Sequence, residues 1–268
     1  MNTLPPFVDD VITSYFTGVS EIDAANVEGI YLIGSLALND YHIGKSDIDF
    51  MTVLKERPSL GVVTSFGRLH ADIEKQFRHA KMDGFYITQN GMREGQLWYP
   101  SFHEGKLIHA RKFEPPRQII LELVENSIPI YGPQASELGF ELTTSQVNSD
   151  LHSNLNYYWK NWVNDHRFPK MKFWKLYFTS TLSEWGVLGV ARQLYTFETG
   201  KIASKIDAGK YLLLRAPEVF RKVINEACEA RIKGRHSLQP SFKRATQTLA
   251  CVRWVLNAFN NKFEEANK

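Results

Sequence analysis

Cysteine is scarce in this chain, and long apolar runs are missing. Its 268 residues include two cysteines, Cys228 and Cys251, a number that argues against a disulfide scaffold. Neither has the neighbouring cysteines or histidines of a zinc site, so both are expected to be core thiols. No apolar run approaches the roughly 20 residues that span a bilayer, and the N-terminal MNTLPPFVDD lacks the basic and apolar regions of a secretory signal. We therefore expect no contact with a membrane and a location in the reducing cytoplasm.

Charge is unevenly distributed along the chain, although the net charge is only +3. Residues 1–150 contain 12 Lys and Arg against 20 Asp and Glu, whereas residues 151–268 contain 20 against 9. Such an asymmetry indicates two units with different partners. An acidic unit is suited to hold cations and a basic unit to face phosphates, although solvated surface charge explains the pattern equally well.

The first half of the chain has the pattern of a mixed α/β domain. Helical spacing of apolar residues predicts helices over SFGRLHADIEKQFRHA and RQIILELVEN. Short runs rich in β-branched and aromatic residues predict strands at residues 29–34, 48–54, 82–88 and 106–113.

The second half changes character from about residue 145, where helical periods dominate. Proline and glycine punctuate four predicted helices, at residues 147–166, 172–198, 217–233 and 239–262. The change coincides with the shift in charge. We therefore expect an α+β architecture, with a mixed sheet flanked by helices over residues 1–150 and an all-α bundle over 151–268.

The stretch GSLALNDYHIGKSDID, residues 34–49, carries the clearest chemical signal. Asp47 and Asp49 are two apart at the start of a strand, so their side chains project from one face while Ile48 points into the core. Two carboxylates this close repel each other unless a cation lies between them. Magnesium is commonly held by one or two carboxylates together with substrate phosphates.

A Gly-Ser turn at the beginning of the same stretch supplies groups that can bind phosphate. Gly34 lets the backbone approach a ligand closely, and its amide and the Ser35 hydroxyl can both donate to phosphate oxygens. Ser46 adds another hydroxyl beside the acids.

A third carboxylate, Asp83, opens the predicted strand MDGFYIT. An adjacent antiparallel strand would bring it next to Asp47 and Asp49. Three acids around two metal ions form the arrangement that stabilises the entering and leaving oxygens in nucleotidyl transfer, and the third acid can accept the proton of an attacking hydroxyl. Paired acids alone also occur as turn or cap residues. The prediction therefore rests on the Gly-Ser turn, the acid pair and the third acid taken together.

These residues resemble the motif of the DNA polymerase β-like nucleotidyltransferase superfamily. Residues 192–205, RQLYTFETGKIASK, are similar to a segment of the bacterial aminoglycoside adenylyltransferases that act on streptomycin and spectinomycin, and IPIYGPQASEL resembles the stretch that closes their N-terminal domain. The resemblance spans about residues 30–235. It implies a monomer with a nucleotidyltransferase domain over 1–150 and a helical substrate- and nucleotide-binding domain over 151–268.

Carried over to the first half, the resemblance implies that Asp47, Asp49 and Asp83 bind two Mg²⁺ ions. Asp83, where the family usually has a glutamate, would also be the catalytic base. Gly34 and the two serines, Ser35 and Ser46, would bind the triphosphate of ATP.

In the second half, the resemblance implies that Lys205 reaches the triphosphate and that Arg192 lies beside it. Arg231 falls near the position where the family can place a tyrosine against the nucleotide. Streptomycin-modifying members carry acidic residues on the helix before Arg192, a stretch in which Glu184 is the acid of this chain. Glu184 and Trp185 are therefore the candidate substrate contacts.

The leading hypothesis is a magnesium-dependent enzyme that transfers AMP from ATP to a hydroxyl of an aminoglycoside or aminocyclitol of spectinomycin or streptomycin type, conferring resistance. A nucleotidyltransferase acting on a protein or RNA acceptor is an alternative, but no RNA-reading motif accompanies the basic second half, and nucleic acid is not the expected partner. A silent nucleotide-binding module is a third hypothesis, disfavoured because all three acids are present.

Overall fold

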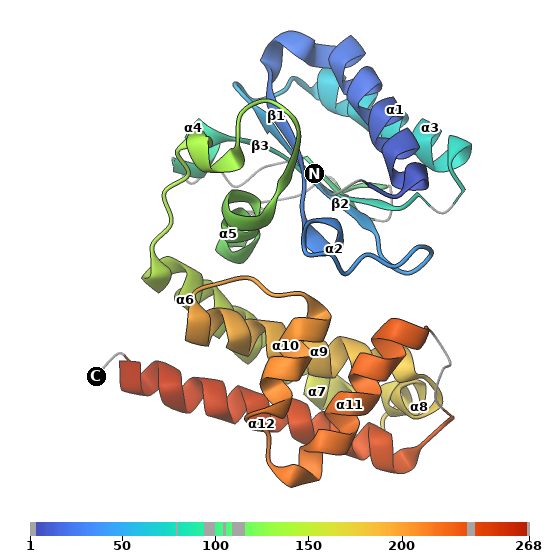
Figure 1. The fold of residues 1–268 in the computed structure, drawn as a ribbon, viewed down its shortest axis with the longest axis vertical. Helices are drawn as coiled ribbons and strands as arrows, with labels where there is room; N and C mark the ends of the chain where they lie inside the picture. The colour runs from blue at the N-terminus through green and yellow to red at the C-terminus, as the bar shows by residue number, and fades with distance from the viewer. Residues whose placement is uncertain are drawn as a thin grey trace. The chain divides into compact units, whose positions relative to one another are not determined.

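The computed structural model describes residues 4–78, 80–93, 100–103, 106–108, 116–234 and 239–266 (Figure 1). The chain separates into two compact units, Met1–Glu141 and Leu142–Lys268. The predicted division at residue 150 falls inside helix α6 (Thr144–Asn154), which begins the helical unit. Thr143 starts this helix with a capping box, in which its side chain accepts from the Gln146 amide and Gln146 binds back to the Thr143 amide.

The first unit is built on a mixed sheet in the order β5-β4-β3-β2-β1-β6. Its described strands are β1 (Val27–Leu32), β2 (Ile48–Leu54), β3 (Met82–Thr88), β4 (Ser101–His103), β5 (Lys106–Ile108) and β6 (Ile128–Tyr131). The β2–β3 pair is parallel and the other four pairs are antiparallel. β4 and β6 were not expected from the sequence, and residues 109–113 of the last predicted strand lie outside the described residues.

Two long helices, α1 (Pro6–Asp23) and α3 (Leu60–Gln76), pack against each other and cover the sheet (Figure 1). The core between them and the sheet joins Tyr15, Phe50 and Phe66, all fully buried. Shorter elements complete the unit: η1 (Ala24–Asn26), α2 (Gly34–Ala37), α4 (Gln89–Arg93), α5 (Arg117–Asn126) and η2 (Ala135–Leu138). Of these, α2 and α5 lie side by side at the end of β1 (Figure 1).

The second unit is helical, as expected. It consists of α6, a π-helical turn η3 (Leu155–Trp159), α7 (Lys160–Asp165), α8 (Met171–Phe178), α9 (Ser180–Thr199), α10 (Lys205–Leu213), α11 (Glu218–Lys233) and α12 (Phe242–Ala266). The predicted helix over 172–198 is in fact two helices, because Thr179 adopts an extended conformation between α8 and α9. Its hydroxyl donates to the carbonyl of Lys175 and helps to end α8.

Helix α9 is the centre of this unit and contacts α6, α8, α10, α11 and α12. Two glycines let tryptophans approach its backbone. A Cβ at Gly186 would lie 2.7 Å from the Trp162 ring, and a Cβ at Gly189 would lie 2.4 Å from the Trp159 ring. No helix in the described part of the chain is long and apolar enough to cross a membrane.

Candidate active site

Asp47 and Asp49 flank the first residue of β2 and share one face, as the spacing predicts. Ile48 and Phe50 are buried in the core, whereas the two aspartates are half-buried. The expected antiparallel neighbour is wrong, because β3 runs parallel to β2 and Asp49 is the register partner of Asp83. The physical reason is α3, the crossover helix that carries the chain from the end of β2 back to the start of β3. The parallel register still places Asp83 beside Asp49.

Gly34 forms a close contact with the Asp49 carboxylate. The glycine has a φ of +67°, in the left-handed region that L side chains rarely adopt. A Cβ built on it would lie 2.0 Å from Asp49 Oδ2. Position 34 therefore requires glycine for two reasons: the backbone conformation of the turn, and the space that the Asp49 carboxylate fills.

The Gly34 amide, which was predicted to bind phosphate, has a partner within the protein. It donates a hydrogen bond to Glu122 Oε1 on α5, at 3.0 Å. The acceptor of this amide is therefore a carboxylate of the protein. Glu122 is only 6% exposed. Sequence reasoning missed it, and the available signal was an acid within the apolar run IILELV.

The two serines have different environments. The Ser35 hydroxyl is buried and has no hydrogen-bond partner among the described residues. Ser46 Oγ accepts a hydrogen bond from the His42 amide at 3.1 Å. Ser35 therefore keeps donor capacity for a ligand, whereas Ser46 helps to hold the loop that precedes Asp47.

The negative charge of the aspartate pair acts on a neighbouring tyrosine. Burial raises the pKa of Tyr41 above its ordinary value, and the charges of Asp47 and Asp49 raise it further. The phenol of Tyr41 therefore stays protonated beside the two acids at neutral pH.

Asp83 has a histidine partner that sequence reasoning did not find. His103 Nδ1 lies 2.7 Å from Asp83 Oδ2, because β4 pairs antiparallel with β3 through Gly84 and Phe102. The His103 side chain is 66% exposed, whereas that of Asp83 is 19% exposed. A carboxylate held by an exposed imidazole is an arrangement that can accept and pass on a proton.

The three acids do not form a complete metal cluster by themselves. Across the described ranges, no three His, Cys, Asp or Glu side chains come together as metal ligands. The two-metal centre on Asp47, Asp49 and Asp83 thus stays a prediction.

In the helical unit, the structure brings together four predicted residues from three helices. The Glu184 carboxylate on α9 lies 3.7 Å from Lys205 Nζ and 3.7 Å from Arg231 Nη1. Lys205 Nζ also lies 5.2 Å from the ring centroid of Trp185, within the range of a cation–π contact. Glu184 is 8% exposed, so its buried charge is balanced by two cations of this chain.

Arg192 lies on the same helix and fixes the loop that leads to Lys205. Its Nε donates to the carbonyl of Ala203 at 3.1 Å. Gly200 ends α9 in the left-handed conformation, and Ser204 caps α10 by accepting from the Asp207 amide. The segment TGKIASK is thus a helix stop followed by a helix start, which places Lys205 at the first position of α10.

Comparisons with known proteins match the two groups of site residues to two different family models. Residues 14–102 match the family model of the nucleotidyltransferase domain, and residues 180–258 match that of the aminoglycoside adenylyltransferase C-terminal domain. The first match contains the Gly-Ser turn and the three aspartates, and the second contains Glu184, Arg192 and Lys205.

A solved structure shares the fold. The crystal structure of spectinomycin adenyltransferase AAD(9) from Enterococcus faecialis with ATP and spectinomycin is similar, with a TM-score of 0.70 and 16% sequence identity. The similarity covers 92% of this chain and 98% of that chain. No curated protein matches the sequence.

Proposed function

Since the chain belongs to the aminoglycoside adenylyltransferase family, and is thus an aminoglycoside nucleotidyltransferase, we propose that it transfers AMP from ATP to a hydroxyl of a spectinomycin-type aminocyclitol, with Mg²⁺ as cofactor. The observation that carries the proposal is the register of Asp49 with Asp83 beside the Gly34 turn. The AAD(9) structure, which contains ATP and spectinomycin, supports both substrates. The match to an aminoglycoside adenylyltransferase domain argues against a protein or RNA acceptor. A monomer in the cytoplasm stays a prediction.

The donor set fits magnesium. Asp47 and Asp49 offer hard carboxylate oxygens from one face of β2, and the buried Ser35 hydroxyl is unsatisfied by the described residues. We assign Asp47, Asp49 and Asp83 as the ligands, with Asp83 brought in from the neighbouring strand through its register with Asp49, and a bound ion would have to draw the three carboxylates together. When bound there, Mg²⁺ would neutralise charge on the triphosphate of ATP.

Asp83 is assigned as the base that accepts the proton of the acceptor hydroxyl. As the hydroxyl oxygen forms a bond to the α-phosphorus, the bond from that phosphorus to the bridging oxygen of pyrophosphate breaks, and the hydroxyl proton passes to the Asp83 carboxylate. His103, hydrogen-bonded to Asp83 Oδ2, holds that carboxylate in one orientation.

Lys205 and Arg192 are assigned to the phosphates of the nucleotide, with Arg231 as a further cation. Glu184 positions Lys205 and Arg231 through its two ion pairs. Lys205 and Arg231 carry two positive charges beside the single negative charge of Glu184, and such cations attract an anionic ligand.

The choice of acceptor follows from how few acidic residues precede Arg192 on its helix and the helix before it. Glu184 is engaged by two cations, and the chain has Phe178 and Leu182 elsewhere on this stretch. A strongly cationic drug such as streptomycin therefore has fewer acidic partners here than an aminocyclitol with less charge. Spectinomycin is the preferred acceptor, and Trp185, which is 45% exposed, is assigned as an apolar wall for it.

The test is direct incubation of the purified protein with ATP, Mg²⁺ and either spectinomycin or streptomycin, followed by mass spectrometry. Spectinomycin should gain the mass of one AMP group, and the Asp47→Asn variant should give no adduct. Adenylylation of streptomycin alone would contradict the assignment of the acceptor. No adduct with a wider panel of aminoglycosides would contradict the proposed function.

A further inference from the structure

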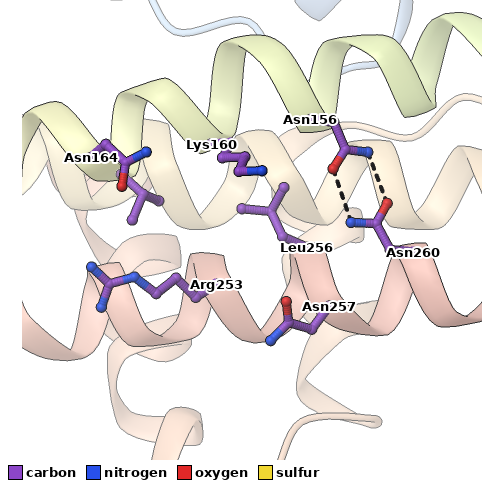
Figure 2. A pocket seen from close by; sticks show the side chains of 8 residues that line it. Asn156, Lys160, Asn164, Arg253, Leu256, Asn257 and Asn260 are labelled. Atoms are coloured by element: carbon purple, nitrogen blue, oxygen red, sulfur yellow. Dashed lines mark hydrogen bonds between the residues drawn. The ribbon is translucent and has the colours of Figure 1, made fainter.

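A separate pocket lies open at the surface of the helical unit, between the η3–α7 segment and α12. It has a volume of about 270 Å³ and shares no residue with the candidate active site. Its lining consists of two cations, four asparagines and two aliphatic residues: Asn156, Lys160, Val163, Asn164, Arg253, Leu256, Asn257 and Asn260. Figure 2 shows the η3–α7 segment and α12 on opposite sides of this space. We name it the asparagine pocket.

The pocket is built by regular spacing on two helices. Asn156, Lys160 and Asn164 are each four residues apart and therefore share a face. On α12, Arg253 and Asn257 are also four apart, and both line the pocket. The π-helical turn that contains Asn156 inserts an extra residue into the helix, a feature that is frequent at functional sites.

Asparagine side chains give the pocket both donors and acceptors. Asn156 and Asn260 form a reciprocal pair, with Nδ2 to Oδ1 distances of 2.8 and 3.0 Å (Figure 2). This pair fixes one end of the pocket. Asn164 and Asn257 make no side-chain hydrogen bond to the described residues, so both amides are available to a ligand. Groups that both donate and accept match the hydroxyls of a polyol.

The charge of the pocket is positive and uncompensated. Lys160 and Arg253 form no ion pair within the ranges that the structure describes, and no acid lines the pocket. By contrast, Lys172 pairs with Asp165, the acid that follows Asn164. An anion between Lys160 and Arg253 would be attracted by both, and a guanidinium matches the geometry of a phosphate.

Two buried aliphatic side chains, Val163 and Leu256, complete the lining. They offer a surface for the carbon skeleton of a ligand. The volume lies just below the range of about 300–1,000 Å³ typical of drug-sized ligand pockets, and so suits a smaller molecule.

We propose that the asparagine pocket binds a small phosphorylated polyol, such as a pentose phosphate. The phosphate would lie between Lys160 and Arg253, and the hydroxyls would bind Asn164 and Asn257. This inference is independent of the acceptor of the adenylyl group.

Calorimetric titration at low ionic strength tests the proposal with three probes: ribose 5-phosphate, inorganic phosphate and ribose. Ribose 5-phosphate should bind saturably and more tightly than inorganic phosphate, and ribose should bind weakest. The double variant Lys160→Gln/Arg253→Gln should weaken binding of ribose 5-phosphate by at least roughly tenfold, because two charge-assisted contacts are lost.

Two controls locate the site. Lys243→Gln removes one charge from an exposed position of α12 outside the pocket and should leave the affinity unchanged. Asp47→Asn should also leave it unchanged, since that residue belongs to the candidate active site. All the substituted side chains are at least partly exposed, so circular dichroism should show the melting temperature of the wild type.

Direct evidence would come from the side-chain amide resonances of Asn164 and Asn257, which should shift on addition of ribose 5-phosphate. Absence of saturable binding, equal weakening by Lys243→Gln, or loss of binding in Asp47→Asn would overturn the proposal. Equal affinity for inorganic phosphate and ribose 5-phosphate would overturn the assignment of a polyol.

Discussion

The Gly34 amide and the buried Glu122 carboxylate are hydrogen-bonded, with 3.0 Å between the nitrogen and Oε1. On its other side, the Cα of Gly34 faces the Asp49 carboxylate. The Gly-Ser turn is therefore held between two acids, one from α5 and one from β2. Its conformation is set by protein groups before any nucleotide binds.

Glu122→Leu should destabilise the first unit and reduce activity, because the partly buried Gly34 amide loses its acceptor, at a cost of up to about 1–3 kcal/mol. Glu122→Gln keeps an oxygen acceptor and should remain near the wild type. Urea unfolding and kcat/KM for adenylylation check both variants. Equal behaviour of the two would show that the hydrogen bond does not position the turn.

Gly34→Ala should abolish most of the activity while leaving the chain folded. The new Cβ would overlap Asp49 Oδ2 and displace that carboxylate. Gly44→Ala is a matched control, since Gly44 also has a positive φ, +76°, but has nothing within 4 Å of its Cβ position. It should cost about 1 kcal/mol of backbone strain and keep activity. Similar losses of activity in both variants would contradict the role of the Gly34–Asp49 contact.

His103→Ala should lower kcat by roughly tenfold, because Asp83 loses the partner that orients it as a base. KM for ATP should change little, and His103→Asn, which retains a donor close to the position of Nδ1, should recover part of the rate. Steady-state kinetics on folded protein separate the two constants. A change in KM for ATP without a change in kcat would argue that His103 acts on the nucleotide instead.

Glu184→Ala should raise KM for ATP, because Lys205 and Arg231 lose the carboxylate that both of them contact. Removing one partner from a buried ion pair costs on the order of 3 kcal/mol. Glu229→Ala, which breaks an exposed pair with Lys233 on α11, is the control and should have little effect. If KM for the antibiotic rises and KM for ATP does not, Glu184 contacts the acceptor directly.

Acid should destabilise the first unit through His70. Burial lowers the pKa of His70 from 6.5 to about 3. The unfolded chain therefore binds a proton that the folded chain does not between these values, and stability falls as the pH decreases below about 6.5, by at most about 1.4 kcal/mol per pH unit.

The check is chemical denaturation of the wild type and His70→Phe between pH 7 and pH 5. His70 stacks on Phe102 with 3.8 Å between ring centroids, so a phenyl ring fits the same aromatic cluster. The variant should lose less stability than the wild type on acidification. Parallel curves for the two proteins would contradict the buried neutral state of His70.

Local patterns in the sequence predicted the parts of the site that depend on neighbouring residues. The alternation of Asp47, Ile48 and Asp49 indicated which side chains leave the core. Lys205 was named only through the family resemblance, and α10, the helix that begins at this residue, was not predicted. The direction of β3 was predicted incorrectly, because strand polarity depends on how the chain crosses between β2 and β3.

Contacts between distant segments were not predictable in the same way. Glu122 meets Gly34, and His103 meets Asp83, only after the sheet and α5 have assembled. The pairing of Glu184 with Lys205 and Arg231 likewise depends on the packing of three helices. No local period encodes such contacts, so single-sequence reasoning could place the residues but not their partners.

The central position of α9 has a consequence for local unfolding. This helix carries Glu184, Trp185 and Arg192, and it is surrounded by five other helices of its unit. Amide protons of segments buried in this way open last and exchange slowest with solvent. The helix that positions Glu184 against Lys205 and Arg231 should thus persist in partially opened forms of the helical unit, and be lost only when the unit unfolds as a whole.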